Sequence, residues 1–211
     1  MAPKKDFYKI NAQKLLSAFE KRYIEGYYCE TKEEALKKAL ELIEKDSTVS
    51  WGGSMTLDEI GLLDALRKGD YSLLDRGTAK NNDELNEIFH KAFSADYYFM
   101  SSNAITLDGK LVNIDGTGNR VAALIYGPKN VIIIAGMNKV VPDEESAIKR
   151  ARNIAAPINA IRLSKQTSCT SVGSCKDCLL PDSICSHIVV TRISKVPNRI
   201  KVILVGEDLG Y

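Results

Sequence analysis

The chain has 211 residues, 45% of them apolar and 27% charged, a composition typical of a globular protein rather than a disordered chain. Its 29 basic and 27 acidic side chains leave a net charge of +2, too balanced to favour nucleic acid or a membrane surface as a partner. No stretch approaches the roughly 18 consecutive apolar residues that a membrane helix needs, and no apolar segment follows the first residues as in a secretory signal. We therefore expect a cytoplasmic protein of one domain, residues 1–211, with cysteines that are reduced or bound to metal.

Helix-sized and strand-sized segments alternate along the first hundred residues. Apolar side chains recur at helical spacing in four stretches, residues 11–24, 31–43, 54–66 and 85–92. Short apolar segments between them are typical of buried strands, at residues 27–29, 48–51, 71–75 and 96–101. Thr31 is expected to cap the second helix, and Ser54 or Thr56 the third. This alternation predicts an α/β fold with a mostly parallel sheet and helices on both faces.

The second half of the chain departs from that alternation. Asp108-Gly109 predicts a tight hairpin between two extended segments within residues 105–114. Residues 130–135 form the most apolar strand and should be central in the sheet. A helix is expected to start at Pro142, and two last strands are expected at residues 188–191 and 200–206.

A glycine-rich turn follows the strand that ends at Trp51. Such a turn lets the backbone approach a ligand closely, and the free N–H groups at a helix start attract anions. The sequence therefore predicts a phosphate or carboxylate site whose members are Gly52, Gly53, Ser54, Met55 and Thr56. The alternative is a tight capped turn that binds nothing.

A second glycine loop is dense in small polar side chains. Asp115 is the candidate general base, and Arg120 is the nearest fixed positive charge, able to hold an anion through two parallel hydrogen bonds. The other candidate ligand-binding residues here are Asn103, Thr106, Asn113, Gly116, Thr117, Gly118 and Asn119. The alternative is that these Asp and Asn side chains only bond to their own turns.

Four of the five cysteines lie close together in a Ser- and Thr-rich loop insertion at about residues 164–187. Their spacing is C-x5-C-x2-C-x6-C, formed by Cys169, Cys175, Cys178 and Cys185. Four thiolates suit either a zinc ion or a 4Fe-4S iron–sulfur cluster, and thiolate ligands alone do not separate the two. Free thiols or disulfides remain the alternative. Cys29 stands apart and is expected to be a small buried residue.

The two histidines do not suggest a hydrolase. His90 lies on a helix and is expected at the surface, and His187 directly precedes a strand. His187 is either a substitute metal ligand or a residue that orients the loop. Since neither has an identifiable Ser or Cys partner, a nucleophile–histidine triad is disfavoured.

Four segments resemble the LUD domain family, the lactate utilisation proteins that include the C-type subunit. They are Ser-Trp-Gly-Gly-Ser-Met-Thr-Leu at 50–57, Ser-Asn-Ala-Ile-Thr-Leu-Asp-Gly-Lys-Leu-Val-Asn at 102–113, Gly-Asn-Arg-Val-Ala at 118–122 and Val-Ile-Ile-Ile-Ala-Gly-Met-Asn-Lys-Val at 131–140. The resemblance implies the ribose-5-phosphate isomerase/CoA-transferase-like, Rossmann-like α/β fold. It is strongest to stand-alone members with a four-cysteine loop.

The segment Asn113-Ile-Asp-Gly-Thr-Gly also resembles the Asn-Lys-Ile-Gly-Thr segment of methylthioribose-phosphate isomerases, which use a catalytic cysteine and aspartate. Here Asn103 stands at the position that resembles the aspartate, and no cysteine lies near the expected place. The nucleophilic glutamate of CoA transferases is not identifiable either. A shared fold therefore does not carry the chemistry with it.

The resemblance implies a link to lactate or organic-acid utilisation and to redox metabolism. We expect a small anionic metabolite as ligand, a metal centre at the four cysteines, and redox partner subunits or a homodimer as partners. The alternatives are a sugar-phosphate isomerase or CoA-transferase-like enzyme, and a non-catalytic subunit of a redox complex.

Overall fold

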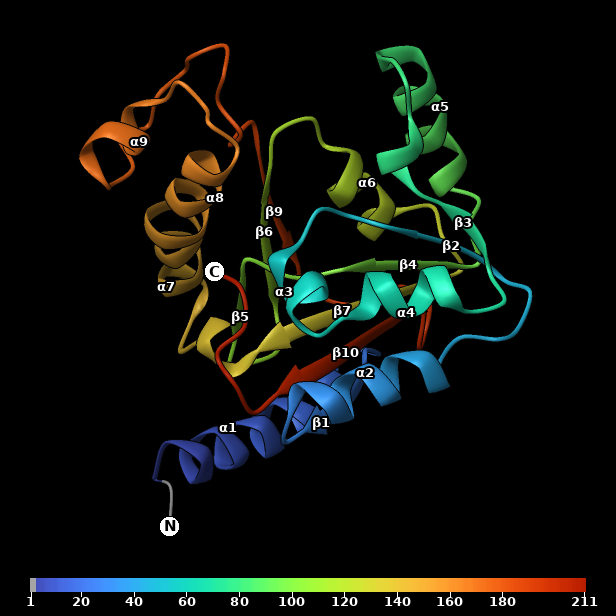
Figure 1. The fold of residues 1–211 in the computed structure, drawn as a ribbon. Coiled ribbons are helices and arrows are strands. Elements are labelled where there is room, and N and C mark those ends of the chain that lie inside the picture. Colours follow the sequence, from blue (N-terminus) through green and yellow to red (C-terminus); the bar gives the residue numbers. More distant parts are fainter. Residues whose placement is uncertain (1–2) are drawn as a thin grey trace.

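The computed structural model describes residues 3–211. Its main sheet has six strands, and every neighbouring pair in it is parallel. The strands lie in the order β1 (Glu25–Cys29), β10 (Ile200–Val205), β7 (Asn130–Gly136), β4 (Tyr97–Met100), β2 (Thr48–Trp51) and β3 (Ser72–Leu74) (Figure 1). The apolar β7 lies in the interior of the sheet, as its composition predicts. The expected α/β class with a mostly parallel sheet is confirmed.

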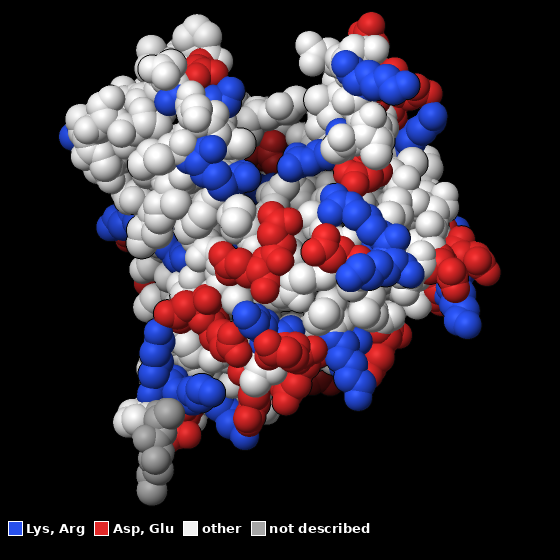
Figure 2. Space-filling view, in the orientation of Figure 1, with Lys and Arg blue, Asp and Glu red and all other residues white. Residues whose placement is uncertain are grey.

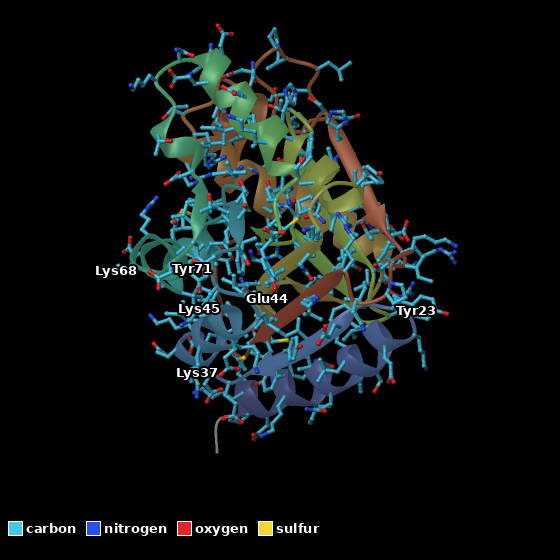
Figure 3. All side chains as sticks on the ribbon, turned by 90° about the vertical axis from the view of Figure 1, so that its right-hand side faces the viewer. Tyr23, Lys37, Glu44, Lys45, Lys68 and Tyr71 are labelled. Atoms are coloured by element: carbon cyan, nitrogen blue, oxygen red, sulfur yellow. The ribbon has the colours of Figure 1, made fainter. Side chains whose placement is uncertain are left out.

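Helices cover both faces of this sheet because its strands are apolar on both sides. In β7, Val131 and Ile133 pack with α1 (Pro3–Glu20) and α6 (Asn119–Ile125). Ile132 and Ile134 point to the opposite face, towards α2 (Lys32–Glu41), α3 (Met55–Glu59) and α4 (Leu62–Lys68). The side view shows α1 running along the sheet, with Tyr23 near the end of that helix (Figure 3).

A second, four-stranded sheet forms beside the first, and the sequence did not predict it as a separate unit. It contains β8 (Val140–Val141), β5 (Ala104–Thr106), β6 (Leu111–Asp115) and β9 (His187–Thr191). The β5–β6 hairpin turns at Gly109, whose φ of +88° suits glycine, as the sequence predicts. β9 pairs antiparallel with β6, so it joins this sheet and not the main one.

The remaining helices frame the upper part of the molecule. α5 (Asn82–Ala92) follows β3, while α7 (Glu144–Arg150), a π-helical turn (Ala151–Ala155) and α8 (Ala156–Arg162) form one continuous rod. Ala147 of that rod packs against the second sheet. The cysteine-rich segment crosses near α8 and contains the short helix α9 (Ser168–Val172) (Figure 1).

Three boundaries differ from those predicted. The first helix extends back to Pro3, and in its additional turns Lys4 and Tyr8 bond to Asp208 near the other end of the chain. The helix expected over 54–66 breaks into α3 and α4 at Gly61, whose φ is +75°. The helix expected to start at Pro142 starts at Glu144 instead. Asp143 is its N-cap, and its carboxylate accepts a hydrogen bond from the backbone N–H of Ser146.

No helix within residues 3–211 combines the length and the hydropathy that crossing a membrane requires.

Candidate functional site

The carboxyl ends of the parallel strands open into one cavity of about 570 Å³, a size typical of small-molecule sites. Segments that follow β3, β2, β4, β7 and β10 all line it, as expected for ligand sites of open α/β sheets. The second sheet adds the end of β6, and α8 with the cysteine-rich segment forms the opposite wall. The space-filling view shows a hollow between the α5 side and the α8–α9 side, with basic side chains along it (Figure 2).

Both glycines after Trp51 lie against arginine side chains; the buried Arg120 leaves no room for a side chain at Gly52, whereas the exposed Arg76 at Gly53 could move aside. A Cβ on Gly52 would lie 2.9 Å from Cδ of Arg120, and one on Gly53 would overlap the guanidinium of Arg76. Ser54 stands at the cap position of α3 but makes no side-chain cap bond. α3 has only five residues, so its dipole is short. The glycine turn therefore lies beside two arginines at the cavity. The free N–H groups at the start of α3 are expected to attract an anion only weakly.

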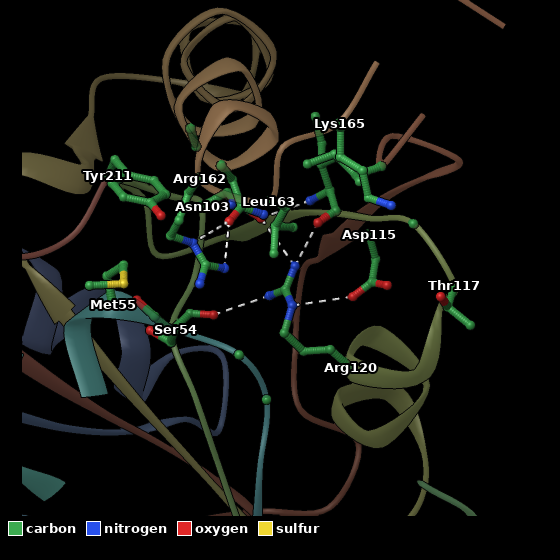
Figure 4. Close-up of a pocket in the computed structure, with 18 of the residues that line it drawn as sticks. Ser54, Met55, Asn103, Asp115, Thr117, Arg120, Arg162, Leu163, Lys165 and Tyr211 are labelled. Atoms are coloured by element: carbon green, nitrogen blue, oxygen red, sulfur yellow. Dashed lines mark hydrogen bonds and ion pairs between the residues drawn. The ribbon is translucent and has the colours of Figure 1, made fainter. Parts of the chain in front are cut away.

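Arg120 lies on the floor of the cavity and bonds only to protein groups (Figure 4). Nη1 donates to the backbone carbonyl of Ser101 and to Oδ1 of Asn113, and Nη2 donates to Oδ1 of Asn103 and the carbonyl of Ile114. Nε is 3.2 Å from Oδ2 of Asp115. A guanidinium has five N–H donors, and these contacts engage all three of its nitrogens. Arg120 therefore ties β4, β6 and α6 together and has little capacity left for an anion.

Both carboxylate oxygens of Asp115 also have partners within the protein. Its side chain is 8% exposed; Oδ2 faces Arg120, and Oδ1 accepts from Gly118 N–H at 2.8 Å. The hydrogen bond to Gly118 fixes the start of α6, where Gly118 has a φ of +91°. These contacts show a positioning role for Asp115 and Arg120. Their catalytic roles stay predictions.

Lys139 is the cavity cation that the sequence analysis missed. It follows β7, its residue is 3% exposed, and its Nζ is 2.9 Å from Oγ1 of Thr56 and 3.0 Å from Oγ of Ser101. Among residues 3–211, no carboxylate lies within ion-pair distance of this amine. Burial lowers its pKa to about 7, with nearby Arg150 and Arg120 acting in the same direction and Glu59 opposing them. The amine therefore loses its proton far more easily than an ordinary lysine.

Two arginines at the cavity rim also have no carboxylate partner in the described chain. The exposed Arg76 lies over Gly53, and Arg162 of α8 donates only to Oδ1 of Asn159 (Figure 4). By contrast, Lys165 pairs with Asp182 at 2.9 Å. Tyr211 also lines the cavity, and its buried hydroxyl has no partner within residues 3–211.

The structure brings most of the predicted ligand-binding residues to this cavity. Those that line it are Gly52, Gly53, Ser54, Met55, Asn103, Asp115, Gly116, Thr117, Asn119 and Arg120. Thr56 lies behind the wall and holds Lys139, and Gly118 lies under the ring of His187. Thr106 is fully buried in the β5–β6 hairpin and bonds to Asp108, away from the cavity. Binding by the lining residues stays a prediction.

The four clustered cysteines are close neighbours but do not assemble a metal site in this arrangement. The pKa of the half-buried Cys185 thiol rises to about 11, first through burial and then through the charges of Cys175, Cys169 and Cys178. All four carry free thiols. Nevertheless, no three His, Cys, Asp or Glu side chains of residues 3–211 are placed to hold a metal ion. The thiols suit zinc or an iron–sulfur cluster chemically, but their positions do not fit either group.

The remaining cysteine and histidines lie where the sequence placed them. Cys29 is 6% exposed, and burial raises the pKa of its thiol. His90 is exposed on α5. His187 begins β9 opposite Asp115, so it links the cysteine-rich segment to the loop that precedes α6.

A model of the LUD domain matches residues 12–205, almost the whole chain. The chain belongs to the LUD domain family. Among curated proteins, no sequence matches it.

Solved structures show how this LUD domain relates to known folds. A DUF162 family protein from Deinococcus radiodurans is similar over 95% of this chain and 98% of that chain, with a TM-score of 0.55 and 10% identity. At that identity the likeness shows the fold alone. A chain of the tetrameric eIF2B-beta2-delta2 complex from C. thermophilum is similar over 54% of this chain and 43% of that chain, with a TM-score of 0.38 and 19% identity. The structure of eIF2B delta from Chaetomium thermophilum is similar over 57% of this chain and 54% of that chain, with a TM-score of 0.37 and 19% identity. These partial likenesses carry no argument about function.

Proposed function

We propose that this LUD domain binds a small organic anion in the cavity at the carboxyl ends of its sheet. One observation carries the proposal: two arginines that line the cavity have no carboxylate within ion-pair distance in the described chain. They are Arg76 and Arg162, both at the rim. The two lining carboxylates, Asp115 and Asp182, are already paired with Arg120 and Lys165. An anion would supply the missing charge, and buried or partly buried cations favour such a partner.

Family membership suggests the chemical class of this anion. LUD membership links the chain to lactate utilisation at most, and a short carboxylate such as L-lactate or pyruvate is small compared with a cavity of about 570 Å³. Arginine guanidinium groups bind carboxylates and phosphates with equal geometric ease. We therefore assign the cavity to carboxylates or phosphates of small metabolites, with Arg76 and Arg162 as the exposed anchors.

Isothermal titration with L-lactate, pyruvate and inorganic phosphate tests this assignment. Hydrogen bonds to charged groups contribute about 1.5–3 kcal/mol, so losing both anchors in Arg76→Gln/Arg162→Gln should weaken binding at least roughly tenfold. Lys14→Gln/Lys21→Gln is the matched control, because these residues line a separate basic patch. The assignment fails if none of the three anions binds, or if both double variants bind like the wild type.

We propose separately that the cysteine-rich segment acts in redox or metal chemistry, the second half of the function that the family resemblance implies. The support is the donor set: four free thiols, three of which influence the pKa of Cys185. Holding a metal requires the segment to close further, since the described residues form no such site.

Anaerobic purification followed by metal analysis and native mass spectrometry tests this second proposal. Stoichiometric iron with visible absorbance, lost in Cys175→Ser/Cys178→Ser, would support an iron–sulfur centre. Stoichiometric zinc in colourless protein would remove the redox role but keep the metal. Metal-free protein would refute both.

A further inference from the structure

The floor of the cavity holds an amine in an environment unlike that of any other lysine of the described chain. Lys139 leaves β7 in the short turn Met137–Lys139, at the carboxyl edge of the main sheet. It lines the cavity with its residue 3% exposed. The second lining lysine, Lys165, is held by Asp182 and is therefore a conventional ion-paired cation.

Two hydroxyl groups orient the amine. Thr56 Oγ1 lies 2.9 Å from Nζ and also approaches the carbonyl of Leu209, so its own proton points to that carbonyl and it accepts from the lysine. Ser101 Oγ lies 3.0 Å from Nζ. A lysine nitrogen offers three positions beyond its carbon, and two are engaged. No third partner from residues 3–211 is within hydrogen-bond distance. A reacting atom would have to reach this third position from the cavity that Lys139 lines, past Gly210, which packs beside Nζ.

The charges around Lys139 favour the neutral amine. Arg150 of α7 donates to the backbone carbonyls of Asn138 and Asn103 and brings no acid with it. Arg120 of α6 is the second nearby cation, and Glu59 of α3 acts in the opposite direction. Burial and the two arginines place the pKa of Lys139 at about 7, so a large share of the amine is unprotonated at neutral pH. Lysines desolvated beside another cation are activated as nucleophiles in this way.

We propose that Lys139 is a covalent residue that forms an imine with a small anion bearing a carbonyl group, while Arg76 and Arg162 hold the anionic end. This inference rests on the proposed anion site and specifies its substrate class, with α-oxo carboxylates such as pyruvate as the first candidates. The neutral Nζ attacks the carbonyl carbon, so that an N–C bond forms as the C=O π bond breaks, and one N–H proton moves to the carbonyl oxygen. The C–O bond of this carbinolamine then breaks, and the hydroxyl leaves with the second N–H proton as one water molecule, which gives the neutral C=N imine.

No oxidant or reductant enters this sequence of steps. Ser101 is the hydroxyl placed to pass the proton, because its oxygen lies beside Nζ and makes no other hydrogen bond to the described chain.

Reductive trapping with sodium cyanoborohydride tests the imine directly. The protein is incubated with pyruvate, with glyceraldehyde 3-phosphate or with inorganic phosphate, reduced, digested and analysed by peptide mass spectrometry. The expected result is a reduced adduct of a carbonyl compound on Lys139, at least roughly tenfold above that on exposed Lys129, the internal reference. Adduct from pyruvate alone identifies an α-oxo acid site, and adduct from the aldehyde alone identifies a sugar-phosphate site. Phosphate gives none.

Two variants separate this inference from the proposed function. Lys139→Arg has no amine that can form an imine and should lose the adduct, while Arg76 and Arg162 still bind the anion by titration. Lys139→Met should lose the adduct and remain folded by circular dichroism, and if it does not fold, Lys139→Arg carries the test alone. Anion binding to the wild type without an adduct on Lys139 above the Lys129 level overturns the imine and leaves the anion site standing. Absence of both adduct and anion binding overturns both proposals.

Discussion

Arg120 and Lys139 are buried basic side chains at the same cavity, but their surroundings differ. Arg120 faces a carboxylate, and its remaining contacts are hydrogen bonds to side-chain amide oxygens and carbonyl oxygens that cross three elements. Lys139 has two hydroxyl neighbours and no carboxylate within ion-pair distance in residues 3–211. A buried charge without a carboxylate partner is costly, so Lys139 gives up its proton easily. The contrast separates a charged arginine that builds the cavity from an amine that is largely neutral at the cavity floor.

The largest expected effect tests the structural side of this comparison. Arg120→Met leaves Asp115 and several oxygens buried without their partner, which should lower the free energy of unfolding by about 3–5 kcal/mol. Urea denaturation measures the loss. Arg67→Met is the control, because Arg67 pairs with Asp75 while 49% exposed and should cost about 1 kcal/mol or less. Equal losses in the two variants would mean that Arg120 does not hold the cavity together.

The pH dependence of stability tests the other side. The pKa of Lys139 is about 7 in the folded protein and near 10.5 when unfolded, so between these values the unfolded chain binds more protons. Stability should therefore rise with pH across this window and level off below about pH 7. We expect the wild type to gain roughly 2–3 kcal/mol relative to Lys139→Met between about pH 7 and pH 9.5. Parallel curves for the two proteins would show that Lys139 titrates normally.

The smallest effect concerns the wall formed by the cysteine-rich segment. Asp182 bonds to Lys165 and to the backbone N–H of Gln166, with both side chains more than a third exposed. Asp182→Asn should lower the unfolding free energy only slightly and speed protease cleavage within residues 164–187. Glu87→Gln, in the exposed Lys91 pair of α5, is the matched control and should leave the cleavage rate unchanged. An unchanged cleavage rate in Asp182→Asn would mean that this ion pair does not restrain the wall.

The sequence predicts individual strands, caps and turns well where their signals are local. The apolar run of β7, the Thr31 cap of α2 and the Asp108-Gly109 turn each report a conformation set by neighbouring residues. The second sheet was missed as a unit, since β9 and β6 are far apart in the sequence and pair only through the tertiary fold. Pattern alone cannot assign a strand to one sheet or another.

The candidate site was predicted in its glycines and missed in its cations. Polar loops after apolar strands indicated the cavity edge, and ten of the residues named from them line it. From the sequence, Arg120 was expected to be free to bind an anion. The acceptors that engage its guanidinium could not be foreseen, because they come from separate elements that only the fold brings together. Lys139 ends the short turn that follows β7, the most apolar strand, so its position just beyond a strand end was the available signal. Its burial and lack of a carboxylate appear only in three dimensions.

The most direct test of the anion site is anomalous diffraction from crystals of the protein soaked in selenate, a heavy tetrahedral anion. Its peaks locate bound anions without assuming any substrate. The account predicts the strongest peak inside the cavity, within hydrogen-bond distance of Arg76, Arg162 or Lys139. A strongest peak at the basic patch of Lys14, Lys21 and Arg192, with none in the cavity, would contradict it.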